Sequence, residues 1–373
     1  MAGLPFIDDA APTASMAPAV EITFGSSAGS GGFGGLADAA TSLLGGAGAP
    51  AWADHLVALD VRLGFAPQVD HAELLIAETA GAPSAALGDS GQIRIGPRGA
   101  LQDLFSGNVL AIERRGDGLR RYQLGNAGHK LSQMHCNQTL TNTTVQDAIA
   151  FAANGAGVNL EARIGGRDGG LPRYVFDDGR NLWEHIARLA ALRGFNAWVD
   201  AAGTLQLSDQ LEQGDTVQSF VFGRDVLALN LWQRSPHSGQ ITAFGGGRVD
   251  DGYTLRKQAA PNRSQVGDGP PQRYYRDGAL QSQDDLSARV AAATLFGRRL
   301  TTTGELLLPG SATLAPGRVV AVEAPPDGSG AFLILAAQHR FDRRDGWRTR
   351  LSVSEAGGMP GSGSPLDALG GLP

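Results

Sequence analysis

One stretch of the chain carries strong helical and strand periodicity in succession. It runs from Asn181 to Leu207 and reads NLWEHIARLAALRGFNAWVDAAGTLQL. Asn181 and Glu184 have the spacing of a capping box, in which each side chain accepts a hydrogen bond from the backbone of the other residue. Apolar residues at helical spacing follow, and Gly194 predicts the end of the helix. The alternating residues after it, interrupted by a turn, predict a hairpin.

The residues before this unit alternate between apolar and polar with the period of strands. The clearest run is 57–63, in which every second residue is Val or Leu. Turn signals rich in Gly and Asp separate it from the other alternating runs. Short strands punctuated in this way are typical of an antiparallel barrel or sandwich. The further strands predicted in this region are 20–24, 72–77, 92–95, 108–113 and 120–124.

Helical patterns return in the middle and late parts of the chain. Thr144 is predicted to cap a helix that ends near Gly155. A strand is predicted near 226–232, and a second long helix over 283–300. Residues 251–283 have loop composition, and a long excursion is expected there.

Two segments far apart in the chain repeat one pattern. Residues 105–124 read FSGNVLAIERRGDGLRRYQL, and residues 332–351 read FLILAAQHRFDRRDGWRTRL. Each begins with Phe, reaches an Asp-Gly turn through an arginine-bearing stretch, and returns as a strand. The second copy has one more residue before the turn. We interpret these as similar hairpins of two related β domains. The side chains expected to pack these domains and present their edges are Phe105, Ile112, Tyr122, Phe332, Phe341, Trp347 and Leu351.

The predicted fold class is α+β and β-rich, with two related antiparallel β-barrel domains flanking a mixed α/β insert domain. The expected order is a flexible N-terminal lead at 1–17, a first β-barrel domain at 18–125 with a Gly/Ala-rich insertion at 25–50, the α/β insert domain at 126–232, a return strand, long loop and helix at 233–300, a second β-barrel domain at 301–356, and a flexible tail at 357–373.

Composition narrows the classes of function. Cys136 is the only cysteine, which excludes an internal disulfide framework and fits a reducing compartment. The formal net charge is −6, which argues against a protein whose task is stable nucleic-acid binding. No stretch approaches the roughly 20 apolar residues of a membrane span, and the start lacks a basic segment ahead of an apolar one. Neither membrane insertion nor Sec-type secretion is therefore expected.

A glycine-rich run contains a literal nucleotide-binding motif. Gly29, Gly31 and Gly34 form GxGxxG after a predicted strand, and Asp60 follows near a second one. The chain then alternates strand with strand rather than strand with helix, which is not the pattern of a dinucleotide-binding fold. In a run this rich in glycine the match is expected by chance, so no cofactor is predicted.

Other polar residues do not form a catalytic signature. His129, His135 and Cys136 lie within eight residues of one another, but no second pair of ligands at zinc spacing accompanies them. His185 and His339 lack a nucleophile on a strained turn, and packing or hydrogen-bonding roles are expected for them. We therefore predict no catalytic residues and no metal. The adjacent carboxylates expected to be caps and turn formers are Asp177-Asp178, Asp250-Asp251 and Asp284-Asp285.

Arginines gather in both copies of the repeated pattern. We interpret them as solvated or intersubunit faces that form salt bridges with acidic patches, and a polyanion track is the alternative. The first set is Arg114, Arg115, Arg120 and Arg121, and the second is Arg340, Arg343, Arg344, Arg348 and Arg350.

The order of these elements resembles the baseplate hub of contractile injection machines, namely phage late control protein D and the N-terminal hub part of type VI secretion VgrG proteins. The residues that carry the resemblance are 104–125, 129–160, 181–207 and 314–353. The resemblance covers roughly residues 55–355. It is a pattern of elements and not a catalytic signature.

The resemblance implies a homotrimer whose six similar barrels adapt a hexameric inner tube to a three-fold spike. It also implies contacts with the spike protein, inner-tube proteins and other baseplate components, after assembly in the bacterial cytoplasm into a phage-tail-like particle. VgrG chains continue into a further barrel and a β-helical spike, whereas this chain has a Gly-rich tail after Val353. A hub-only member with its spike on a separate chain is therefore expected.

Several alternatives stay open at this point. The parent machine is a phage, a bacteriocin-like particle, an extracellular injection system or a secretion apparatus. A tail-associated or nucleotide-dependent enzyme is the second functional hypothesis. A secreted module with two β domains is the third, and the lack of disulfides and of a signal peptide disfavours it.

Overall fold

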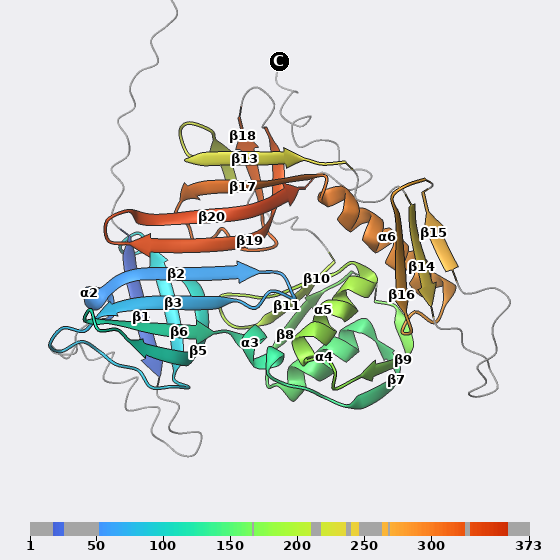
Figure 1. Ribbon diagram of the computed structural model, residues 1–373, viewed down its shortest axis with the longest axis horizontal. Coiled ribbons are helices and arrows are strands. Elements are labelled where there is room, and N and C mark those ends of the chain that lie inside the picture. Colours follow the sequence, from blue (N-terminus) through green and yellow to red (C-terminus); the bar gives the residue numbers. More distant parts are fainter. Residues whose placement is uncertain are drawn as a thin grey trace, which may run out of the picture.

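The computed structural model describes residues 18–25, 52–165, 168–209, 218–235, 240–245, 263–267, 269–324 and 329–356. Within them the protein is β-rich and is dominated by a 12-stranded sheet (Figure 1). No helix in this part of the chain is long and apolar enough to cross a membrane. Several sequence predictions lie outside the described residues, namely the lead, the insertion beyond Gly25, the GxGxxG glycines, the Asp250-Asp251 pair and the C-terminal tail.

The N-terminal half of the sheet follows the alternation of the sequence. Its antiparallel strands lie in the order β1-β4-β5-β6-β3-β2, and their inward residues, such as Leu59 and Leu74, form one buried cluster. The strands predicted between residues 20 and 124 are all confirmed. Their bounds are β1 (Ala19–Gly25), β2 (Leu56–Gly64), β3 (His71–Ala77), β4 (Ser90–Gly96), β5 (Gln102–Arg114) and β6 (Leu119–Gly125), with a short helix α2 (Trp52–His55) before β2.

The C-terminal half of the sheet has its own buried cluster, which includes Leu306 and Leu351. The order is β12-β18-β19-β20-β17-β13, and all pairs are antiparallel except β12 with β18. The strand predicted near 226–232 is thus present, and it lies in this half of the sheet. The bounds are β12 (Gln218–Val221), β13 (Ala228–Gln233), β17 (Thr302–Pro309), β18 (Val319–Glu323), β19 (Gly330–Asp342) and β20 (Gly346–Glu355).

The two halves repeat one topology. If the described strands of each half are counted in chain order, both halves read first, fourth, fifth, sixth, third, second across the sheet. The halves differ at one place, because β1 is antiparallel to β4 whereas β12 is parallel to β18. The repeat that was visible in the sequence for one hairpin therefore extends to the whole strand order.

The two halves also meet edge to edge. Residues Ala58–Gly64 of β2 pair antiparallel with Ala336–Asp342 of β19, so the β domains expected from the sequence are joined in one continuous sheet (Figure 1). Strands separated by more than 270 residues in sequence form this junction, and local alternation carries no information on such a pairing.

A mixed α/β body fills two connections of the repeat. One lies between β6 and β12, and the other lies between β13 and β17. The first contains α3 (Ala127–Ser132), β7 (Gln138–Thr144), α4 (Val145–Gly155), β8 (Leu160–Arg163), β9 (Gly170–Phe176), α5 (Leu182–Arg193), β10 (Asn196–Val199) and β11 (Leu205–Ser208). The second contains β14 (Gln240–Gly245), β15 (Arg263–Val266), β16 (Gln272–Asp277) and α6 (Gln283–Arg299).

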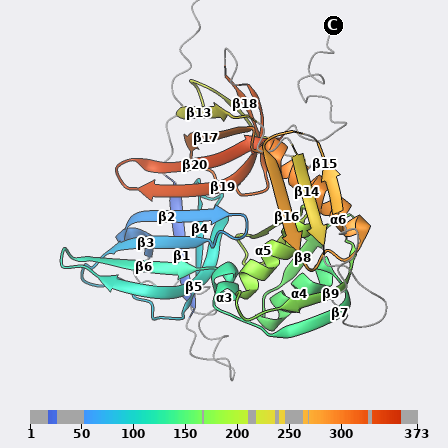
Figure 2. The ribbon, with the colours of Figure 1, turned by 45° about the vertical axis from the view of Figure 1, so that its right-hand side comes forward.

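Both connections contribute to one hydrophobic core. Ile149 and Leu189 from the first are buried in the same cluster as Leu286 and Val290 from the second. Figure 2 shows α6 and the β14–β16 sheet beside α5. The loop expected over 251–283 was therefore wrong for its described part, because β15 and β16 pair with β14. Short polar strands of this kind depend on their partner more than on their own pattern.

The helix and hairpin predicted from 181–207 are confirmed. The Asn181 side chain accepts from the backbone N–H of Glu184 at 2.9 Å, and the Glu184 carboxylate accepts from the N–H of Asn181 at 3.1 Å. Gly194 ends α5 with φ = 77°, in the left-handed region that favours glycine. Strands β10 and β11 then pair as the expected hairpin.

Candidate functional site

The junction between β2 and β19 joins the two halves of the sheet, and side chains make contacts across it on both faces. On the outer face, the Gln338 side-chain amide donates to the Asp60 carboxylate at 2.7 Å. On the core face, Phe341 and Trp347 pack against the buried cluster of the N-terminal half. The tip of the β19–β20 hairpin therefore covers the core of the other half, and not the core of its own.

The structure places the predicted packing residues in two groups. Phe105 and Tyr122 are buried in the N-terminal core, with Ile112 packed against it. Phe332 and Leu351 are buried in the C-terminal core. Phe341 and Trp347 belong with the first group through the junction, which sequence similarity between the hairpins did not indicate.

Three of the four arginines of the first hairpin have side-chain partners within the chain. Arg115 pairs with Asp117 at 3.0 Å, and Arg121 pairs with Glu113 at 3.1 Å. Arg120 forms an ion pair with Glu78 and also donates to the Tyr122 hydroxyl at 3.0 Å. These contacts stabilise the hairpin and its neighbour β3 and do not form a track for a polyanion.

The second hairpin presents its arginines differently. Arg343 donates to the backbone carbonyls of Ala53, Asp54 and Leu56, so it binds α2 and the start of β2 in the N-terminal half. Arg340 and Arg348 lie opposite one another on β19 and β20 and are exposed. Their adjacent positive charges give this face of the sheet a basic character.

His185 is a structural residue. It is fully buried; its Nδ1 lies 2.9 Å from the Tyr174 hydroxyl and its Nε2 lies 3.0 Å from the carbonyl oxygen of Asp177. A carbonyl only accepts, so Nε2 carries a proton and donates to Asp177. Both ring nitrogens are thereby hydrogen-bonded inside the core, as expected for a histidine with a packing and hydrogen-bonding role.

The remaining titratable candidates also have packing or backbone contacts. Burial lowers the pKa of His339 to about 4, and a hydrogen bond to the backbone of Leu314 opposes this fall, so this histidine is neutral near pH 7. His135 bonds the carbonyl of Asp178 through Nδ1 at 3.1 Å, and Cys136 packs against the α/β core. The described part of the chain holds no group of three His, Cys, Asp or Glu side chains that could bind a metal.

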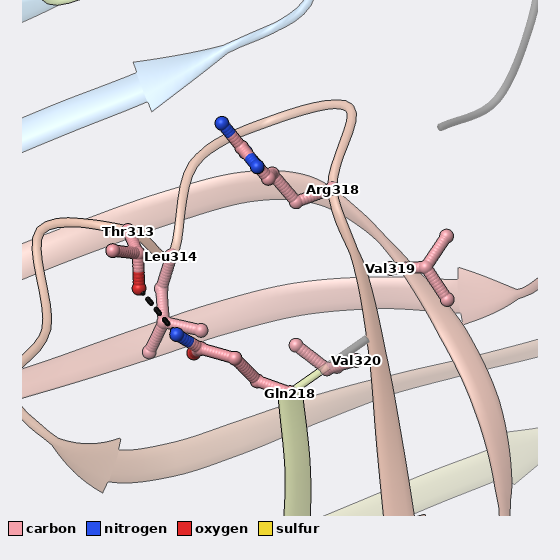
Figure 3. A pocket seen from close by; sticks show the side chains of 6 residues that line it. All are labelled: Gln218, Thr313, Leu314, Arg318, Val319 and Val320. Atoms are coloured by element: carbon pink, nitrogen blue, oxygen red, sulfur yellow. Dashed lines mark hydrogen bonds between the residues drawn. The ribbon is translucent and has the colours of Figure 1, made fainter. Parts of the chain in front are cut away.

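A small pocket lies in the C-terminal half, where Gln218 donates to the Thr313 hydroxyl at 2.7 Å (Figure 3). Leu314, Val319 and Val320 also line it. Its volume is about 60 Å³, far below the roughly 300 Å³ at which ligand pockets begin. This pocket has room for solvent but not for a nucleotide.

A larger groove of about 570 Å³ lies between the N-terminal half of the sheet and the α/β body. Its polar lining includes Gln92, Asn108 and Asn159, and Lys130 is the one charged side chain among the described residues that line it. Neither a carboxylate nor a histidine is among the described residues that line it.

Solved structures with the same fold come from phage tails and a secretion system. A tail protein from Neisseria meningitidis MC58 aligns with a TM-score of 0.64 at 15% identity over 81% of this chain and 93% of that chain. The 43 kDa tail protein of prophage MuSo2 from Shewanella oneidensis gives 0.65 at 15% identity over 82% and 96%. No protein-family model matches the chain, and no curated protein does either.

A third neighbour is an E. coli component of the type VI secretion system, described as structurally similar to the T4 bacteriophage tail proteins gp27 and gp5. It aligns with a TM-score of 0.57 at 12% identity over 81% of this chain and 73% of that chain. At these identities the likeness is one of fold. The chain thus has the fold of phage tail proteins and of a type VI secretion component.

Proposed function

We propose that this protein is a structural hub subunit in the tail or baseplate of a contractile injection machine. Three copies form a ring that adapts a hexameric inner tube to a three-fold spike, as in the late control protein D and VgrG-like hubs. Its partners are the spike, the inner-tube proteins and other baseplate components. The whole assembles in the bacterial cytoplasm before it joins the particle.

The repeated strand order is the observation that carries this proposal. Each chain holds two β units with one topology, each around its own buried cluster. A ring of three such chains presents six similar barrel-like units to a six-fold partner while keeping three-fold symmetry for the other partner. The fold shared with tail proteins supports the same role.

The mass of the purified chain in solution tests the proposal. Light scattering is expected to give a species near three times 38.7 kDa, either for the chain alone or after addition of the spike protein encoded beside it. Binding of the inner-tube protein to that species is the second expected result. A monomer that binds neither the spike protein nor the inner-tube protein would contradict the hub function.

A further inference from the structure

β2 and β13 are equivalent strands with different surroundings. Each is the second strand of its half in chain order and pairs with the third. Leu59 of β2 lies opposite Leu74 of β3, and Leu229 of β13 lies opposite Leu306 of β17. The opposite edge of β2 is occupied by β19. Within the described residues, β13 pairs with β17 alone and ends the sheet. An edge that is filled in one copy of the repeat is therefore open in the other copy.

β5 and β19 are equivalent in the same way, and a bulge fixes their register. The pairing of β5 with β6 shifts between Val109, opposite Leu124, and Ala111. The pairing of β19 with β20 shifts between Ile334, opposite Val353, and Ala336. Leu110 and Leu335 are thus the extra residues at one shared position.

The edge beyond this bulge is occupied in only one of the two strands. On β19 it binds β2, from Ala336 to Asp342. On β5 the matching residues 111–114 pair with β6 alone in the described part of the chain. The open edge of β5 is therefore the counterpart of the surface that receives β2 within the chain.

Large apolar side chains are exposed on or next to both strands that have an open edge. Leu110 at the β5 bulge is 39% exposed, and Trp232 on β13 is 43% exposed. Leu227, just before β13, is 55% exposed. An unpaired strand edge with exposed apolar side chains pairs with another chain unless charge or cover protects it.

We infer that β13 of one chain pairs antiparallel with β5 of a second copy, repeating between chains the β2–β19 junction found within the chain. This inference rests on the proposed ring and specifies its interface. The register follows from the intrachain junction, in which Gln338 lies opposite Arg62 and Ala336 opposite Gly64. Glu113 and Ala111 correspond to Gln338 and Ala336, and Trp232 and Arg234 correspond to Arg62 and Gly64. The same register therefore places Glu113 opposite Trp232 and Ala111 opposite Arg234.

The geometry of one chain makes this contact head-to-tail. Figure 1 shows the strands stacked from β13 through β17, β20, β19, β2, β3 and β6 to β5, with the two open edges at opposite ends of the stack. One chain cannot bring these edges together by itself. A contact between unlike edges closes into a ring only when the repeated rotation completes a full turn without a rise along its axis, and the proposed ring requires a step of this kind at each junction.

Mixed single-cysteine chains test the register. All variants carry Cys136→Ser, and Glu113→Cys is mixed with Trp232→Cys in one reaction. A second reaction mixes Arg115→Cys with Asn230→Cys, which are opposite in the same register and leave Trp232 in place. A bifunctional thiol reagent short enough to join only facing strands is added to the ring, whose mass is first checked by light scattering. Both mixtures are expected to give a cross-linked dimer on a denaturing gel.

The controls separate this interface from others. Each single-cysteine chain alone should give no dimer, and Glu113→Cys mixed with Leu227→Cys should give none, because Leu227 lies five residues along the strand, roughly 17 Å away. A dimer from one variant alone would indicate a two-fold contact and overturn the inference. A trimer in which neither pair reacts would overturn the edge pairing and leave the hub function standing. A chain that stays monomeric with the spike would contradict both.

Discussion

The guanidinium of Arg343 donates to the carbonyl oxygen of Leu56 at 2.6 Å. Arg343 lies in the turn between β19 and β20, and Leu56 begins β2. The same side chain donates to the carbonyls of Asp54 at 2.6 Å and Ala53 at 3.1 Å. These are carbonyls at the end of the short helix α2, where positive charge is favourable. One side chain thus fastens the C-terminal hairpin to the N-terminal half.

Replacing Arg343 is expected to weaken this fastening. Arg343→Ala should lower the free energy of unfolding by about 2 kcal/mol, because charge-assisted hydrogen bonds to several carbonyls are lost together. Arg343→Lys should recover only part of it, since a point charge cannot reproduce the fork of a guanidinium. Denaturant unfolding measures both. Arg344→Ala in the same turn is the matched control, with an expected change within about 0.5 kcal/mol. An equal loss in the control would contradict the role of Arg343.

A second prediction concerns the contact between the two parts of the α/β body. Arg193 of α5 pairs with Asp285 of α6 at 2.5 Å, and their side chains are only 6% and 3% exposed. Arg193→Met and Asp285→Asn should each cost about 3–5 kcal/mol, because each leaves a buried charge without its partner. The double variant should cost clearly less than the sum of the two.

The exposed pair Arg180–Asp177 provides the control for this cycle. Its side chains are 47% and 42% exposed, so Arg180→Ala should cost less than about 1 kcal/mol. Equilibrium unfolding of the native protein, the two buried single variants and the double variant measures the four free energies of unfolding of the cycle. Strict additivity of the two buried substitutions would show that the pair does not couple α5 to α6.

A third prediction separates backbone strain from crowding at the end of α5. Gly194 and Gly118 have the same φ of 77°, so alanine is strained at both positions. A Cβ at Gly194 would lie 2.9 Å from the Cβ of Ala292 on α6, whereas nothing lies within 4 Å of one at Gly118. Gly194→Ala should therefore destabilise by about 1 kcal/mol more than Gly118→Ala. Thermal unfolding compares the two, and equal losses would mean that α6 moves aside freely.

The sequence predicted what local patterns determine. The capping box of Asn181 and Glu184, the glycine at 194 and the strands between 20 and 124 depend on neighbours a few residues away, and the structure confirms each of them. The repeat of the two hairpins was also visible, because the Asp-Gly turns and alternating arginines are local features.

Long-range pairing explains what could not be predicted. β2 and β19 each show the alternation of apolar and polar residues that is typical of a strand. This alternation does not indicate which strand pairs with which. Similarly, residues 272–277 form β16 only because β14 lies beside them. The carbonyl contacts of Arg343 follow from the junction, so they were beyond sequence reasoning as well. Phe105 and Tyr122 could be predicted as packing residues because they face the core of the half to which their own strands belong.

The last prediction concerns pH and a carboxyl group at the boundary between the sheet and the α/β body. Asp70 is 3% exposed; it accepts from the N–H of Gly64 at 2.7 Å and from the side-chain amide of Asn126 at 2.9 Å. Burial raises the pKa of Asp70 to about 7, and the bonds from Gly64 and Asn126 oppose this rise. The folded state thus holds a proton that the unfolded state has released above about pH 4.

The sign of the effect follows from this difference. Because the folded state binds more protons between about pH 4 and pH 7, the free energy of unfolding falls as pH rises through that range. Asp70→Asn has no such titration. Between pH 4 and pH 8, the native protein should therefore lose up to about 4 kcal/mol of unfolding free energy relative to Asp70→Asn.

Measuring both proteins at each pH isolates Asp70. Burial lowers the pKa of His339 to about 4, so its contribution to stability is lost as pH falls from about 6.5 toward 4. This trend opposes that of Asp70 in the native protein, but it is common to both proteins and cancels in their difference. Denaturant unfolding at several pH values between 4 and 8 gives the two curves. Parallel curves would show that Asp70 titrates in the fold as it does in the unfolded chain, and that its burial does not hold the proton.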